Sequence, residues 1–171
     1  MSHFPTSVIT TVKNDLIAKA NTIYNGKTLA IHQAESNYDA IAAYYNENST
    51  DKLWKPDVKV AYLPSAVVGE EFKTTAQLQN VYFMLTQGSY IDSTQSIIRN
   101  SFLTVFPAQN SPTVANLLNL CRRYMTRFEK LFAVVNGTDY SVPNIAVPGK
   151  ADFVIYGFLL KGQDIEEILL N

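Results

Sequence analysis

The clearest pattern along the chain is an apolar stripe between Ser111 and Gly137. Ser111 followed by Pro112 is typical of a helix start, and Asn136-Gly137 is typical of a helix end. Between them, apolar side chains recur at alternating steps of four and three residues, the spacing of one helix face: Val114, Leu118, Cys121, Met125, Phe128, Phe132 and Val135, widened by Leu117, Tyr124 and Leu131. The pattern predicts one long amphipathic helix over about 112–135.

Shorter stretches with helical spacing or helix-capping residues occur on both sides of this helix. They predict helices over 7–24, 38–46, 75–86, 92–105 and 165–170, a short helical turn over 28–34, and a short helix or turn from residue 64 to about residue 69. Val58–Tyr62 alternates weakly and is compatible with extended chain. Residues 153–160 mix β-branched and aromatic side chains around Gly157, which predicts a minor β element near 151–160.

Polar segments rich in Pro, Gly or Asn connect these elements. They predict loops at about 46–57 and 138–150. No internal repeat and no shift of composition divides the 171 residues. We therefore expect a mainly α fold, a single-domain helical bundle over 1–171.

Charge is scarce in this sequence. Charged residues make up 17%, aromatic residues 12%, and the net charge is −1. Such a balance creates no overall field that would attract nucleic acid or a membrane surface. A weakly charged, Tyr-rich surface resembles the composition of protein interfaces, so we expect assembly with other proteins.

The N-terminus has no basic head followed by an apolar run, and the longest apolar block, 153–160, is too short to span a bilayer. We therefore expect no membrane partner. The expected location is the cytoplasm, or a particle assembled there.

No combination of residues predicts catalysis. His3 and His32 are too few for a zinc site, and His32 is expected to be a partly exposed helix residue. Cys121 lies on the apolar stripe and is expected to be buried. Glycine-rich phosphate loops and nucleophile elbows are absent from the sequence. We expect no enzyme activity, no metal, no cofactor and no small-molecule substrate.

Two features have both an ordinary and a functional interpretation. The predicted long helix carries a basic ridge, Arg122, Arg123, Arg127 and Lys130. It is either a solvated face with local pairing to Glu129 or a contact with carboxylates of a neighbouring subunit. Nucleic acid is a weaker third interpretation, because the aromatic side chains lie on the opposite side of the helix.

Trp54, in a loop with Lys55 and Pro56, either anchors an interface or closes the end of the helix core. The candidate protein-contact residues are therefore Trp54, Arg123, Arg127 and Lys130.

Three segments together resemble a family of small structural proteins of tailed bacteriophages. They are Ala43-Tyr44-Tyr45-Asn46 followed by Leu53-Trp54-Lys55, then Arg122–Ala133 with its Arg-Phe-Glu-Lys-Leu-Phe centre, then Leu160–Ile165 before a last helix. The resemblance implies a virion or morphogenesis protein assembled in the host cytoplasm, and it implies no catalytic residues.

Head–tail neck rings are often built from small, mostly helical subunits, whereas decoration and tail-tube proteins more often use β-sheet. By this analogy we expect a non-enzymatic neck or head–tail connector subunit, an adaptor or completion protein that forms a homo-oligomeric ring. The alternatives are a capsid decoration or tail-associated structural protein, and a cytosolic helical assembly factor. Expected partners are copies of itself and portal, neck or tail proteins, with nucleic acid limited to DNA passing through a ring.

Overall fold

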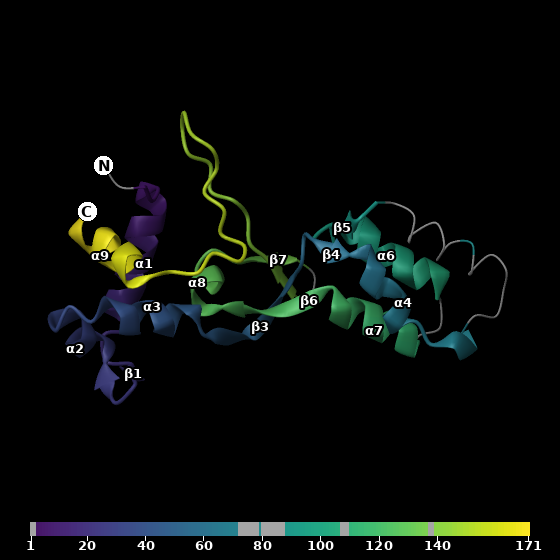
Figure 1. Cartoon of the computed structure of the whole chain (residues 1–171), viewed down its shortest axis with the longest axis horizontal. Coiled ribbons are helices and arrows are strands. Elements are labelled where there is room, and N and C mark those ends of the chain that lie inside the picture. The colour runs from purple at the N-terminus through teal and green to yellow at the C-terminus, as the bar shows by residue number, and fades with distance from the viewer. Residues whose placement is uncertain (1–2, 72–78, 80–87, 107–109, 137–138) are drawn as a thin grey trace. The chain divides into compact units, whose positions relative to one another are not determined.

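The computed structural model describes residues 3–71, 79, 88–106, 110–136 and 139–171, and the chain forms two compact units (Figure 1). Unit 1 comprises Met1–Asp51, Tyr124–Val135 and Val142–Asn171. Unit 2 comprises Lys52–Arg123 and Asn136–Ser141. The expectation of one domain stays a prediction, because compact units of one chain can still fold together.

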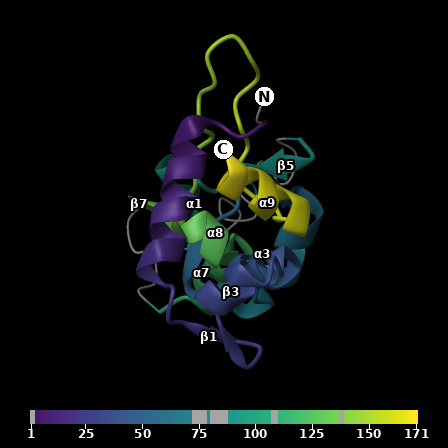
Figure 2. The same ribbon diagram turned by 90° about the vertical axis from the view of Figure 1, so that its left-hand side faces the viewer.

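Unit 1 is mostly helical. Its helices are α1 (Thr6–Ala18), α2 (Leu29–Ala34), α3 (Tyr38–Asn46), α8 (Arg127–Lys130) and α9 (Gly162–Leu170). α3 packs against α9, α2 and α8, and α1 also contacts α9. Figure 2 labels α1, α3, α8 and α9 of this unit. A small hairpin, β1 (Ile23–Tyr24) with β2 (Lys27–Thr28), turns at Asn25-Gly26, where both residues have positive φ. An Asn-Gly pair is the preferred sequence for such a turn.

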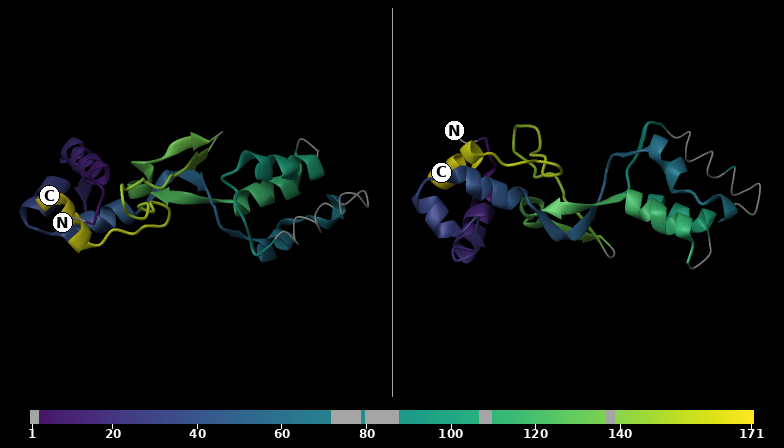
Figure 3. Two further views of the ribbon diagram at one scale, coloured as in Figure 1. Left: turned by 90° about the horizontal axis from the view of Figure 1, so that it is seen from above. Right: turned by 60° about the horizontal axis from the view of Figure 1, so that its bottom comes forward.

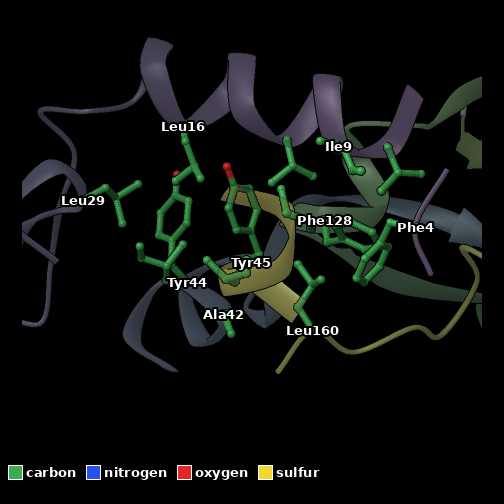
Figure 4. Close-up of a cluster of buried hydrophobic side chains, with 14 of the residues drawn as sticks. Phe4, Ile9, Leu16, Leu29, Ala42, Tyr44, Tyr45, Phe128 and Leu160 are labelled. Carbon is green, nitrogen blue, oxygen red and sulfur yellow. The ribbon is translucent and has the colours of Figure 1, made fainter. Parts of the chain in front are cut away.

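The core of unit 1 lies between α1, α3, α8 and α9. Figure 4 shows Leu16 of α1 facing Tyr44 and Tyr45 of α3, and Ile9 of α1 on the side of Phe128 of α8 and Phe4. The hydroxyl of Tyr45 points toward α1 and donates a hydrogen bond to Asp15, at 2.8 Å. The helices of unit 1 are therefore held by one continuous apolar cluster.

Unit 2 packs short elements around a second apolar cluster. Its elements are β4 (Val58–Lys59), the 3-10 helix η1 (Val60–Tyr62), α4 (Leu63–Ala66), the 3-10 helix η2 (Gly69–Glu71), β5 (Tyr90–Ile91), α6 (Ser96–Val105), α7 (Pro112–Leu120) and β8 (Asp139–Ser141). α7 packs against α4 and α6, and its position beside α6 is visible in Figure 3. β4 pairs with β5 in antiparallel fashion.

A four-stranded sheet has the order β6-β3-β8-β7. Its other strands are β3 (Asn48–Trp54), β6 (Arg122–Thr126) and β7 (Val134–Asn136). β3 and β8 are parallel, with Leu53 opposite Tyr140. The chain passes from one unit to the other within β3 and within β6.

The prediction of a mainly α fold is wrong, because the structure is mixed α/β. The single helix expected over 112–135 is α7, β6, α8 and β7 in succession. The start was predicted correctly, since the side chain of Ser111 accepts a hydrogen bond from the Val114 amide. The helix nevertheless ends at Leu120.

Two interactions explain the break after Leu120. The carbonyl of Cys121 accepts hydrogen bonds from the Lys55 amide and from the Ser93 hydroxyl, so long-range partners take the place of a further helical turn. Thr126 then starts a new helix, because its side chain accepts from the Glu129 amide while the Glu129 carboxylate accepts from the Thr126 amide. This reciprocal pair is a capping box, which belongs at a helix start and not in a helix interior.

The boundaries of other elements also differ from the predicted ones. α1 ends at Ala18 and not at Tyr24, and the expected loop at 46–57 contains β3. The expected β element near 151–160 is reduced to one isolated antiparallel bridge, between Ile145 and Phe153. The helix expected over 75–86 lies outside the described residues, apart from residue 79.

Candidate interaction site

The four predicted contact residues do not share one helix face. Arg127 and Lys130 lie on α8 in unit 1, whereas Trp54 and Arg123 lie on β3 and β6 in unit 2. The basic ridge depended on an uninterrupted helix, and β6 interrupts it. Within unit 1, Arg127 and Lys130 are brought to one site.

That site is a cavity of about 480 Å³ in unit 1. Its walls come from α1, α3, β3, α8 and the residue after α8, and they consist of Asp15, Lys19, Tyr44, Asn48, Ser49, Thr50, Arg127, Lys130 and Leu131. We call this cavity the charged pocket. Three cationic side chains and one carboxylate line it, together with side-chain hydroxyls and an amide.

Each cation in the pocket has a carboxylate partner. The Arg127 guanidinium lies 3.0 Å from the Glu47 carboxylate, the Lys130 ammonium 2.5 Å from Asp51, and the Lys19 ammonium 2.9 Å from Asp15. The Arg127 and Lys130 side chains are 31% and 51% exposed. Such exposed pairs stabilise the fold by only about 0–1 kcal/mol each, so an incoming charged group can exchange with a partner at low cost.

Arg127 is the best oriented of the three cations. Its guanidinium donates to the Tyr44 carbonyl at 3.2 Å and lies 4.2 Å from the centre of the Tyr44 ring. Stacking on an aromatic face and a carbonyl hydrogen bond fix the planar group in one orientation. The pocket wall at Arg127 is therefore preorganised.

Asp15, another residue of the pocket lining, is held by two partners. One carboxylate oxygen pairs with Lys19 and the other accepts from the Tyr45 hydroxyl. Burial, and then the neighbouring Asp15 charge, raise the pKa of Tyr45 well above its ordinary value. The phenol therefore stays protonated as the donor that holds Asp15.

α8 is positioned by Glu129, which is fully buried. One carboxylate oxygen accepts from the Thr126 amide at 2.8 Å, and the other accepts from the Gly157 amide at 2.7 Å. The carboxylate thereby ties the start of α8 to the segment that leads into α9. One interpretation of the sequence was local pairing of the basic ridge with Glu129, whereas the Thr-x-x-Glu spacing indicates the capping box that the structure shows.

Trp54 lies in the core of unit 2 and is 5% exposed. The Arg99 and Arg122 guanidinium groups lie 4.7 and 5.4 Å from the centre of its ring, and Arg122 pairs with Asp139 at 2.9 Å. Of the two roles considered for Trp54, the structure shows the packed one, so we leave Trp54 out of the proposed contact surface. Arg123 is half-buried on β6.

The residues examined for chemistry are mostly inaccessible. Cys121 is fully buried as expected, and burial raises the pKa of its thiol to about 11. His32 is 3% exposed, which corrects the expectation of a partly exposed residue. Its Nε2 lies 2.9 Å from the Tyr24 carbonyl and its Nδ1 lies 3.3 Å from the Asn37 amide nitrogen, so it has the role of a buried structural histidine.

The described part of the chain offers neither a metal-binding cluster nor a helix that could span a membrane. Within it, no cluster of three or more His, Cys, Asp or Glu side chains could hold a metal ion. No helix formed by those residues has both the length and the apolar character needed to cross a membrane.

Comparison with protein-family models, with curated proteins and with solved structures finds no match to this chain. The resemblance to phage structural proteins therefore stays a prediction.

Proposed function

We propose that this protein is a non-enzymatic structural subunit of a tailed bacteriophage particle, and that it forms a ring at the neck or head–tail connection. The observation that carries the proposal is the charged pocket. It gathers Arg127 and Lys130, two of the predicted contact residues, on a preorganised and partly exposed surface.

The charge arrangement favours a protein partner. Exposed ion pairs can exchange partners with the side chains of a neighbouring subunit, and charged groups at an interface fix register and specificity more than affinity. The low overall charge supports repeated contacts between copies, since no large like-charge field opposes assembly.

A second candidate is a capsid decoration or tail-associated structural protein. The four-stranded sheet favours it, because the preference for a neck ring rested partly on a mostly helical fold. Copy number distinguishes the two candidates: a ring uses few copies per particle, and a capsid or tail lattice uses many. A protein that is missing from purified mature particles would instead be an assembly factor.

The first test is the oligomeric state of the full-length protein, measured by light scattering coupled to size exclusion, together with its copy number in purified particles. A discrete ring-sized species present in few copies supports the neck proposal. A protein that never self-associates and is absent from particles contradicts both structural candidates.

The second test is Arg127→Glu. The substitution places two carboxylates together at Glu47 and removes the stacked guanidinium, so incorporation into particles should be lost while circular dichroism shows a native fold. Lys27→Glu is the matched control, because it also breaks an exposed ion pair, with Glu35, outside the pocket. Normal incorporation of folded Arg127→Glu protein would count against the proposal.

A further inference from the structure

A short hairpin in unit 1 is poorly covered by its own unit. Residues 146–152, which we call the arm, are all exposed except Val147, which is half-exposed. Figures 1 and 2 show this part of the chain, drawn in yellow-green, standing away from the helices α1, α3 and α9 of the same unit.

The arm is closed at its base and at its tip by backbone hydrogen bonds. The Ile145 amide donates to the Phe153 carbonyl at 2.9 Å, and the Phe153 amide donates to the Ile145 carbonyl at 2.8 Å. At the tip, the Lys150 amide donates to the Val147 carbonyl, and Gly149 has a φ of 72°, a conformation that glycine adopts without strain.

The base of the arm is anchored in the core of unit 1. The ring of Phe153 lies 5.3 Å from that of Phe4 and 5.0 Å from that of Phe158, measured between ring centres. A hairpin that is already formed and anchored loses little conformational freedom when it docks. The arm is therefore built as a preorganised projection.

The side chains of the arm complement the charged pocket. The arm presents Val147 and Pro148 at its turn and carries opposite charges on Lys150 and Asp152. The pocket offers Leu131 for apolar contact, the three cations for the Asp152 carboxylate, and Asp15 for the Lys150 ammonium. Its volume of about 480 Å³ lies within the usual range for ligand sites, about 300–1,000 Å³.

We propose that the arm of one copy of this chain inserts into the charged pocket of a second copy. This inference rests on the proposed function and names the two surfaces through which copies meet. Because arm and pocket are different surfaces of one chain, the contact is head-to-tail, and such contacts generate a ring when the rotation between copies closes. The described cavity in unit 2 is a poorer acceptor, since Lys59 is the one charged residue in its lining.

Disulfide trapping between two variants, each with one introduced cysteine beside native Cys121, tests the contact. Pro148→Cys marks the arm, and Thr50→Cys marks the exposed rim of the pocket on β3. When the two full-length variants are mixed under assembly conditions, or combined in purified particles, and a mild oxidant such as oxidised glutathione is added to accept the two electrons, a covalent dimer should form. Native Cys121 does not compete, because its thiol is buried.

The control pairs Pro148→Cys with Asn14→Cys, which is exposed on α1 but outside the pocket lining. Much less dimer is expected from this pair. Equal trapping of both pairs, or trapping of Pro148→Cys on a different virion protein alone, would overturn the inference.

Charge reversal provides an independent test. Asp152→Lys and Lys130→Glu should each weaken self-association about tenfold or more, because each variant places like charges opposite each other across the interface. The double variant restores opposite charges in the head-to-tail contact and should recover association. Lys27→Glu serves again as the control that loses an exposed ion pair elsewhere.

The outcomes separate this inference from the proposed function. If the protein forms rings and enters particles while both single charge reversals associate normally, the arm-to-pocket contact is wrong and the structural role stands. If the protein neither self-associates nor occurs in particles, the proposed function itself fails.

Discussion

At the scale of single residues, Glu129 is the most consequential side chain in unit 1. It is fully buried, and each of its carboxylate oxygens accepts a hydrogen bond from a different backbone amide. Hydrogen bonds to a charged group contribute about 1.5–3 kcal/mol each to stability. A buried donor or acceptor that loses its hydrogen-bond partner destabilises the fold by more than the net contribution of that bond.

Glu129→Gln should therefore lower the free energy of unfolding by about 2 kcal/mol, because the amide NH₂ then faces a backbone N–H. Urea unfolding measures this loss. Glu166→Gln, at an exposed position on the neighbouring α9, is the control and should change stability by less than about 0.5 kcal/mol. Equal stability of the two variants would show that the Glu129 hydrogen bonds contribute little.

Tyr45 makes the fold sensitive to alkaline pH. Its folded pKa is raised above the ordinary value of 10.0, so the folded state keeps the phenolic proton where the unfolded chain loses it. The stability linked to this group is complete below pH 10.0 and is lost progressively as the pH rises above it.

Tyr45→Phe should remove this alkaline loss while costing about 1 kcal/mol near neutral pH, the net worth of the hydrogen bond to Asp15. Denaturant unfolding at neutral pH and above pH 10.0 checks both effects. Tyr62→Phe, where the side chain is exposed, is the matched control. An unchanged alkaline slope in Tyr45→Phe would contradict the assignment.

At the scale of elements, the break between α7 and α8 determines where the charged pocket forms. β6 replaces the middle of the expected helix, and the Thr126 capping box starts α8 where Arg127 and Lys130 can line the pocket. The orientation of the two cations therefore depends on the capping residue more than on helix propensity.

Thr126→Ala should destabilise the protein by about 1 kcal/mol, the usual effect of removing a helix N-cap. It should also weaken self-association, because α8 carries two pocket residues. Thr126→Ser retains the hydroxyl acceptor and should restore both properties. Thermal unfolding measures the stability, and light scattering measures the self-association. A Thr126→Ala variant that loses stability without any change in association would show that α8 takes no part in assembly.

At the scale of the whole molecule, assembly through exposed ion pairs makes a prediction about salt. The screening length shrinks from about 10 Å at 0.1 M to about 3 Å at 1 M ionic strength, which weakens contacts between exposed charges. Self-association should therefore weaken as sodium chloride is raised over this range, as measured by light scattering. Association that strengthens with salt would instead indicate an apolar contact.

Local sequence patterns predicted several features of this chain correctly. They include the Ser111 start of α7, the bounds of α3, a final helix before the C-terminus and the burial of Cys121. The first three depend on residues within a turn or two of one another, so the sequence alone determines them, whereas the burial of Cys121 also required the packed core of unit 2. The sequence also contained the Thr-x-x-Glu signal at Thr126, although the longer apolar periodicity concealed it.

Tertiary contacts decided the rest. The 112–135 stripe has helical spacing throughout, yet the Cys121 carbonyl is bonded by Lys55 and Ser93, and residues 122–126 join a sheet with β3. The charged pocket likewise gathers residues from α1, α3, β3 and α8 that are more than a hundred positions apart at their extremes. Hydrogen bonds and ion pairs between distant segments leave no periodic trace in the sequence, so only the folded chain brings these side chains together.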